Sequence, residues 1–286
     1  MIETLLAHFG TDRSSFLGAG AEAQVFALGP DKALRVHAAD TVAADVAARV
    51  ALLSRLQNAP QMVRFEIPHI RDFGFQHGFH FTIEDRLTGR PMHQALPQCT
   101  PTQRERLVND YLESATQVTG LLKNETEYGE LALANPIRSI SFKDFLRARA
   151  EASLNVCGLN IDVDDLIAKI DEPDKPSLVH LDYCPSNVLC ENGKITAVLD
   201  FGGTTIAGCA SFNPIAAAAF LNPSITPAAN DAGQQQANAW LDDHGFTNKR
   251  TPITKWLAAY WSFCGKNDDL PLFHCCRDIL GSPKES

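Results

Sequence analysis

Hydrophobic positions follow two different periods along this chain of 286 residues. In roughly the first third, the apolar runs are short, rich in aromatic residues and separated by glycine turns, which is typical of antiparallel strands. One amphipathic segment, residues 41–57, interrupts them and predicts a helix. Later in the chain, apolar residues recur every three or four positions, which predicts a succession of helices. The pattern therefore predicts an α+β fold, with a small antiparallel sheet followed by a larger, mostly helical part.

The first part of the chain carries the signals of a sheet. Strand-like pieces are expected within residues 16–28 and over residues 32–36, and a hairpin of two aromatic-rich strands over residues 73–84. Gly18 and Gly20 lie between the two pieces of the first segment, where glycine lets backbone N–H groups approach a phosphate closely. A plain turn explains such a G-x-G hairpin as readily, so the glycines gain meaning only from their order relative to the other elements of the chain.

The later apolar spacing predicts helices over residues 101–123, 141–155, 160–170, 215–220, 232–244 and 251–264. Trp256 and Tyr260 share one face of the last helix, where packing in the core is expected and stacking on a substrate ring is the alternative. Asp164 and Asp165 open the third helix. Acids at this end interact favourably with the helix dipole, and binding of a cationic substrate is the alternative.

The net charge of −9 is concentrated in the middle of the chain. Residues 101–200 hold 17 acids and 10 bases, so −7, whereas residues 1–100 (10 and 9) and 201–286 (7 and 6) each carry −1. This balance argues against nucleic-acid binding, which needs a basic surface. An acidic cleft would attract a cationic small molecule, and a solvated acidic surface explains the charge equally well.

Composition places the chain among soluble globular proteins, with 45% hydrophobic and 21% charged residues. No apolar run approaches the roughly 18 residues of a membrane span, so no membrane partner is expected. The eight cysteines are scattered and form no C-x-x-C pair. This favours reduced thiols in a cytoplasmic protein over a disulfide framework or a zinc site.

One polar motif stands among short apolar runs. His180, Asp182 and Asn187 come after one run, and Asp200 ends another, thirteen residues after Asn187. The spacing matches H-x-D-x-x-x-x-N plus D-x-G, a phosphoryl-transfer signature. In that chemistry one Asp accepts the proton of the attacking hydroxyl, while an Asn and a second Asp offer oxygen ligands to Mg²⁺ on the nucleotide. Asp182 is therefore the candidate catalytic residue, and Asn187 and Asp200 are candidate magnesium ligands.

The motif resembles the catalytic loop of the aminoglycoside phosphotransferase and choline kinase-like family, which carries Pro beside a small residue, here Pro185 and Ser186. Protein kinases instead have Arg after the His and Lys two residues after the Asp, where this chain has Leu181 and Cys184. The match therefore points to a small-molecule kinase.

The resemblance implies a two-lobed protein kinase-like fold. Residues 1–87 would form the N-terminal nucleotide-binding lobe, and residues 88–286 the catalytic and substrate-binding lobe. The implied phosphoryl donor is ATP or GTP with Mg²⁺, bound between the lobes.

The resemblance also assigns positions in the first lobe. Arg35 falls where kinases have their phosphate-binding Lys, and a lone surface charge is the alternative. Glu84 and Arg86 fall in the segment that links the lobes and offers backbone groups to the purine. The helix over residues 41–57 lacks the Glu that kinases pair with this cation. Either Asp45 replaces that Glu, or phosphate alone holds Arg35.

Two further residues are expected to support the catalytic loop. His180 would fix the loop rather than transfer protons. Asn213 stands where the family has an Asp that opens a helix, and it can still accept a backbone hydrogen bond. The segment after Asp200, residues 202–209, departs from the family because it lacks the acid of a G-D-P loop.

The leading functional expectation is phosphorylation of a hydroxyl on a cationic antibiotic, and hence antibiotic resistance. The first alternative is a metabolic kinase that acts on choline, an amino sugar or a glycated amine. The second is a nucleotide-binding pseudokinase, which the missing helix Glu and the altered loop favour. The intact Asp182, Asn187 and Asp200 argue against the pseudokinase.

Overall fold

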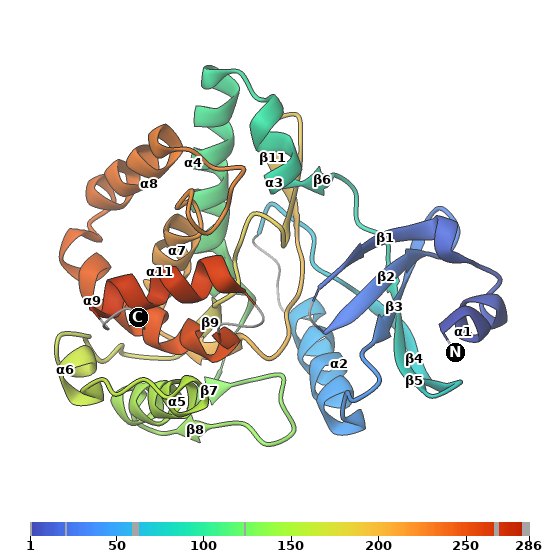
Figure 1. The fold of residues 1–286 in the computed structure, drawn as a ribbon, viewed down its shortest axis with the longest axis horizontal. Helices are drawn as coiled ribbons and strands as arrows, with labels where there is room; N and C mark the ends of the chain where they lie inside the picture. The colour runs from blue at the N-terminus through green and yellow to red at the C-terminus, as the bar shows by residue number, and fades with distance from the viewer. Residues whose placement is uncertain (1, 21, 59–62, 123, 266–268, 282–286) are drawn as a thin grey trace.

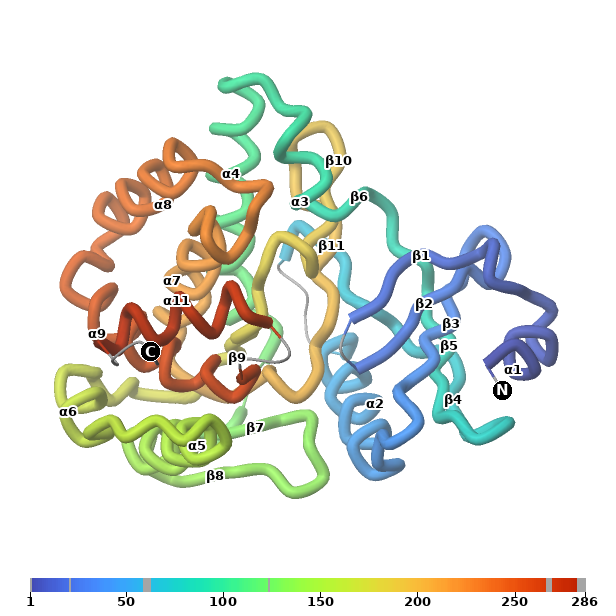
Figure 2. Tube along the Cα trace, in the orientation of Figure 1, coloured from blue at the N-terminus to red at the C-terminus, as the bar shows by residue number. Residues whose placement is uncertain are grey.

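The computed structural model describes residues 2–20, 22–58, 63–122, 124–265 and 269–281. A small part built on one sheet lies beside a larger, mostly helical part, and the chain passes between them just before β6 (Figures 1 and 2). The expected α+β class is confirmed. Most of the long helices fall in the second part of the chain, as their apolar spacing predicted.

The small part is a five-stranded antiparallel sheet in the order β1-β2-β3-β5-β4. Its strands are β1 (Phe16–Ala19), β2 (Ala23–Ala27), β3 (Lys32–His37), β4 (Ile70–Gln76) and β5 (Phe79–Asp85). Helix α1 (Ile2–His8) and a short 3-10 turn η1 (Arg13–Ser15) precede the sheet. Helix α2 (Ala43–Gln57) lies between the sheet and the larger part (Figure 1). This position lets α2 contact both parts.

Two small sheets carry the catalytic-loop motif of the larger part, β11-β10-β6 and β8-β7-β12-β9. Their strands are β6 (Arg90–Pro91), β7 (Tyr128–Glu130), β8 (Arg138–Ser139), β9 (Ser177–His180), β10 (Val188–Glu191), β11 (Lys194–Val198) and β12 (Thr205–Gly208). Asn192 and Gly193 join β10 to β11 with φ angles of 52° and 76°. A tight primed turn needs two such residues, and β10 and β11 accordingly form an antiparallel hairpin.

Helices make up most of the larger part. They are α3 (Met92–Ala95), α4 (Pro101–Gln117), α5 (Phe142–Cys157), α6 (Val163–Ala168), α7 (Phe212–Ala219), α8 (Asp231–Asp243), α9 (Thr247–Trp261) and α11 (Leu270–Leu280), with 3-10 turns η2 (Leu96–Gln98), η3 (Val118–Leu121) and η4 (Ser262–Cys264). Side-chain caps fix where several of them begin. The hydroxyl of Thr100, for example, accepts the N–H of Gln103, whose side chain in turn accepts the N–H of Thr100.

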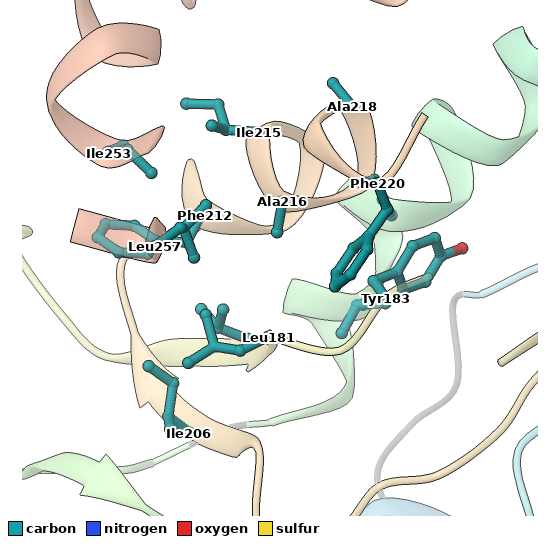
Figure 3. Close-up of a cluster of buried hydrophobic side chains, with 14 of the residues drawn as sticks. Leu181, Tyr183, Ile206, Phe212, Ile215, Ala216, Ala218, Phe220, Ile253 and Leu257 are labelled. Atoms are coloured by element: carbon teal, nitrogen blue, oxygen red, sulfur yellow. The ribbon is translucent and has the colours of Figure 1, made fainter. Parts of the chain in front are cut away.

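The apolar core of the larger part reaches the catalytic loop. Leu181 and Tyr183 are fully buried and lie in a cluster with Ile206, Phe212 and Leu257 (Figure 3). Burying each such side chain stabilises the fold by about 1.5–3 kcal/mol. Since these two neighbours of Asp182 are anchored in the core, the short segment between them is fixed in place.

Several elements carry no clear signal in the sequence. Neither α1 nor α11 was predicted, nor was the short strand β12. The expected helix over residues 101–123 ends at Gln117, because the chain tightens into the 3-10 turn η3, and residue 123 lies outside the described residues. Over the described ranges, no helix is both long enough and apolar enough to cross a membrane.

Candidate active site

The site begins at the end of β9, where the chain leaves the sheet and places the half-buried Asp182 between two fully buried residues. The side-chain amide of Asn187 donates to Asp182 Oδ2 over 2.7 Å and to the Asp182 carbonyl over 3.0 Å. The backbone N–H of Leu199 donates to the carbonyl of Asn187 over 2.7 Å. These bonds fix the orientation of the Asp182 carboxylate and tie the loop to the segment that leads to Asp200.

His180 and Asn213 hold the base of this loop. The N–H of His180 donates to Asn213 Oδ1 over 2.9 Å, and Asn213 Nδ2 donates to the Leu178 carbonyl over 2.8 Å. Burial lowers the pKa of His180, so its ring is neutral and Nε2 donates to the Leu199 carbonyl, 2.8 Å away. Asn213 thus uses both a donor and an acceptor, where a carboxylate offers only acceptors.

Asp200 lies just after β11 in the left-handed backbone region, with φ of 59°. Its Oδ1 lies 2.9 Å from Arg35 Nη2, which comes from the third strand of the small sheet. This ion pair joins the two parts of the molecule. Arg35 therefore lies beside the candidate magnesium ligand Asp200, and its expected contact with phosphate stays a prediction.

A buried polar cluster lies behind this ion pair, between the sheet and α2. Three side chains converge on one oxygen, Glu84 Oε1: Arg49 Nη1 at 2.8 Å, Thr82 Oγ1 at 2.7 Å and Arg35 Nε at 3.7 Å. Glu84 and Arg49 are both less than 10% exposed. The acid that partners Arg35 therefore comes from β5, and the helix contributes a second cation instead of an acid.

The surroundings of Asp182 and Asp200 shift the pKa values of the two carboxyl groups in opposite directions. Burial, together with the charge of Asp200, raises the pKa of Asp182 to about 7. Burial alone would also raise the pKa of Asp200, but the guanidinium groups of Arg35 and Arg49 outweigh it and lower that pKa. A carboxylate with a pKa near neutrality suits a general base, while one that stays ionised suits a metal ligand.

The donor set fits Mg²⁺ on a nucleotide. Asp200 and Asn187 supply hard oxygen ligands of the kind Mg²⁺ takes, and it usually draws its remaining ligands from phosphate and water. The carboxylate of Glu22 lies close by, since a Cβ placed on Gly202 would be 3.6 Å from Glu22 Oε2, and partial burial and Asp200 raise the pKa of Glu22. Within the described ranges, no group of three or more His, Cys, Asp or Glu side chains could hold a metal unaided.

The glycines of the first hairpin lie beside this region. Gly18 pairs with Val25 across a register shift between β1 and β2, and the N–H of Gly20 donates to the Ala23 carbonyl. A Cβ at either glycine would meet no atom within 4 Å. The space above the hairpin is therefore open, as a ligand-binding loop requires, while Ala21 lies outside the described residues.

The structure places the three remaining candidates of the first lobe. Asp45 does not pair with Arg35, because its Oδ1 accepts the N–H of Ala134 over 2.8 Å, and this corrects the suggestion that Asp45 replaces the missing Glu. Glu84 is next to last in the interior strand β5, and its side chain faces the buried cluster. Arg86 directly follows β5, and its N–H donates to the Asp31 carbonyl over 2.8 Å. The contact of these two positions with the purine stays a prediction.

The four substrate-contact candidates also lie away from the site or inside the core. Asp164, on α6, pairs with Arg147 over 2.7 Å, and α6 lies at the far edge of the helical part from α2, which places Asp165 there too (Figures 1 and 2). Trp256 and Tyr260 are at most 1% exposed. Core packing explains both aromatic residues and leaves neither ring a surface for stacking.

Comparison with known proteins decides the family. The model of the phosphotransferase enzyme family matches residues 14–208, more than half of the chain and the whole segment from the glycine hairpin to β12. The chain belongs to the phosphotransferase enzyme family. It is therefore a phosphotransferase with a hydroxyl acceptor, and the recognition made on the catalytic-loop motif is confirmed.

Solved structures show that this phosphotransferase has the kinase-like fold of the aminoglycoside phosphotransferases. A thermostable mutant of APH(4)-Ia, in a ternary complex with AMP-PNP and hygromycin B, is 20% identical with a TM-score of 0.69, covering 100% of this chain and 99% of that one. ADP-bound APH(2'')-Ib is 15% identical with a TM-score of 0.58, covering 93% and 90%. A search of curated proteins finds no match.

Arg49 was not predicted to lie in the site, although its position on α2 carries a signal for this. The buried stripe of α2 runs through Val46, Arg49, Leu52, Leu53 and Leu56. An Arg on the apolar stripe of an amphipathic helix must find a buried anion, so its position alone indicates an ion pair beneath the helix.

Proposed function

We propose that this phosphotransferase transfers the γ-phosphoryl group of ATP or GTP to a hydroxyl of a small, cationic molecule. The observation that carries the proposal is the convergence of Asp182, Asn187, Asp200 and Arg35 at the junction of the two parts. Together they supply a base, oxygen ligands for a metal and a cation for phosphate, which are the parts that phosphoryl transfer needs.

In this proposal the four side chains divide the tasks of phosphoryl transfer among them. Asp182 orients the acceptor hydroxyl and takes its proton, and the amide of Asn187 keeps the carboxylate in that orientation. Asn187 and Asp200 hold Mg²⁺, which when bound neutralises charge on the phosphates. Arg35 turns from Asp200 to the phosphate oxygens. Since the transition state needs little covalent assistance, positioning and charge provide most of the rate enhancement.

The nucleotide is proposed to lie between residues 1–87 and residues 88–286. Backbone N–H groups around Gly18 and Gly20 would cover the phosphates, as glycine permits. Complexes of similar structures contain either adenine or guanine nucleotides: one is APH(2'')-Ib with ADP, another APH(2'')-IIIa with GDP and kanamycin. We therefore propose that either ATP or GTP is the phosphoryl donor.

The acceptor is proposed to be an aminoglycoside-like antibiotic, with resistance as the biological outcome. Support comes from the net charge of −7 over residues 101–200 and from hygromycin B and kanamycin in the similar structures. A metabolic acceptor such as choline, an amino sugar or a glycated amine has the same cationic character. We further propose that the enzyme works in the cytoplasm, because all eight cysteines are free thiols.

A nucleotide-binding pseudokinase is the second candidate. The observation in its favour is the Arg35–Asp200 ion pair, which occupies the cation and the metal ligand with one another. The elevated pKa of Asp182, about 7, favours the enzyme, because a binding module has no use for a tuned base.

The test is phosphate transfer from ATP and GTP, with Mg²⁺, to a panel of aminoglycosides, choline, amino sugars and glycated amines. Asp182→Asn serves as the matched control, because it keeps size and hydrogen-bonding shape while removing the base. Transfer by the wild-type protein that the variant lacks would support the proposal. Nucleotide binding without transfer to any acceptor would favour the pseudokinase.

A further inference from the structure

We propose that Arg49 is a second cation of the nucleotide phosphate site, acting beside Arg35. The inference rests on the proposed function, because it concerns the binding of the same nucleotide. Kinases pair their phosphate-binding cation with an acid on the neighbouring helix. In this chain the helix contributes a guanidinium group, and the acid, Glu84, comes from the sheet.

The first support is the incomplete pairing of Arg49. Its side chain is 4% exposed, and only Nη1 has a partner, Glu84 Oε1 at 2.8 Å. Nε and Nη2 are buried with no hydrogen-bond acceptor among the described residues, and the same is true of Nε of Arg35. Buried donors are nearly always satisfied in folded proteins. Two guanidinium groups with spare donors around one shared carboxylate indicate that an oxygen-rich anion completes the cluster.

The second support is the balance of charge. Arg35 and Arg49 carry two positive charges, and Glu84 and Asp200 carry two negative charges. If Mg²⁺ engages Asp200, Arg35 loses that partner, and Glu84 is then the only carboxylate that forms an ion pair with either guanidinium group among the described residues. Two cations then share one ion-paired carboxylate. A polyphosphate chain supplies the missing negative charge.

The third support is proximity to the metal ligand. Arg49 Nη1 and Arg35 Nε approach the same oxygen, Glu84 Oε1, at 2.8 and 3.7 Å, and Arg35 Nη2 lies 2.9 Å from Asp200 Oδ1. Arg49 is therefore separated from the candidate metal ligand only by Arg35 and the shared carboxylate. Its neighbour His37 is buried and has a pKa lowered to about 4 by burial and by these two guanidinium groups, so it adds no charge of its own.

The alternative is that Arg49 only neutralises Glu84, and a single and a double substitution distinguish the two roles. In Arg49→Met alone, Glu84 is left unbalanced and draws Arg35 toward itself. In Arg49→Met/Glu84→Gln, no unbalanced carboxylate remains, and Arg35 is free to bind phosphate. If Arg49 served only to neutralise Glu84, the double variant would recover the affinity of the wild-type protein.

The experiment measures, by calorimetry with Mg²⁺, the affinity for a nucleoside triphosphate and for the corresponding nucleoside. It uses the wild-type protein, Arg49→Met, the double variant and Arg55→Met, a control with the same substitution on the same helix. We expect Arg49→Met to weaken triphosphate binding roughly 10- to 100-fold and nucleoside binding less than about twofold. The double variant should stay within a few-fold of Arg49→Met, and Arg55→Met should match the wild type.

Each contrary result has a distinct meaning. Equal loss of both ligands would show a structural role, unchanged triphosphate binding would show no role, and recovery in the double variant would show that Arg49 only neutralises Glu84. Any of these overturns the inference and leaves the proposed function standing. A wild-type protein that binds neither ATP nor GTP overturns the proposed function itself, and the inference falls with it.

Discussion

Arg35 Nη2 lies 2.9 Å from Asp200 Oδ1, an ion pair between residues 165 positions apart in the chain. Asp200 is 30% exposed and Arg35 13%, so water screens the pair only partly. In the proposed function both groups are needed elsewhere once a nucleotide binds, Asp200 for Mg²⁺ and Arg35 for phosphate. On that proposal, the ion pair joins the two parts until the nucleotide replaces it.

Asp200→Asn is expected to abolish the dependence of nucleotide affinity on Mg²⁺ and to lower turnover by about 10³-fold or more. The reason is that an amide retains the shape of the ligand but not the charge that attracts the metal. Titration of nucleotide with and without Mg²⁺ checks the first effect, and a coupled assay checks the second. A variant that still binds nucleotide more tightly with Mg²⁺ would contradict the assignment of Asp200.

Activity is expected to rise with pH and to level off above an apparent pKa of about 7. The base must be ionised to take a proton, and burial with Asp200 nearby raises the pKa of Asp182 to about 7, so the ionised fraction grows through this range. The pH dependence of kcat/KM measures this apparent pKa, because it reports the ionisation of the free enzyme. A flat profile between about pH 5.5 and 8 would exclude Asp182 as a base with a raised pKa.

Asp182→Asn is expected to stabilise the fold at high pH. A folded-state pKa of about 7, against 3.8 unfolded, means that the contribution of this carboxyl to stability is full below pH 3.8 and is lost as pH rises through 7. Asn imitates the protonated form and avoids that loss. Denaturant unfolding should give the variant a gain of about 1–4 kcal/mol at pH 8, shrinking toward zero near pH 4. A gain independent of pH would contradict this cause.

Asn213→Asp is expected to destabilise the protein by about 2–4 kcal/mol, even though the family pattern has Asp here. The carboxylate keeps the bond from the His180 N–H but cannot donate to the Leu178 carbonyl, which it would instead repel. Asn230→Asp is the control, because the exposed Asn230 uses its Oδ1 to accept the N–H of Gly233, and an Asp can do the same. Equal stabilities of the two variants would refute the donor role of Asn213.

Local pattern was enough to predict the catalytic loop and the helical half. The short apolar runs that precede Asp182 and Asp200 form the strands β9 and β11, as their composition predicted. The aromatic hairpin and the long helices could be predicted because the hydrophobic periodicity of each is set by residues close together in the sequence.

Long-range pairing was not predictable in the same way. The apolar stripe of α2 indicates that Arg49 faces inward, but only the packing of α2 on the sheet shows that Glu84 is the acid it shares with Arg35. The exposed acids of α6 illustrate the same limit, since charge in the sequence says nothing about distance from a cleft. Glu84 was expected only as part of the segment that links the lobes, whereas in the structure it pairs with Ala33 of β3 and its side chain contacts Arg49 of α2.

Detection of the phosphorylated acceptor tests most directly whether Asp182 is the base that serves phosphoryl transfer to a small molecule. The wild-type protein and Asp182→Asn are incubated with Mg²⁺, ATP or GTP and the cationic acceptors, and the products are examined by mass spectrometry. We expect an acceptor that gains one phosphoryl group with the wild-type protein only, and phosphorus NMR should show that this group is an ester of a hydroxyl. Equal phosphorylation by Asp182→Asn would contradict the assigned base, and hence the site from which the function was inferred.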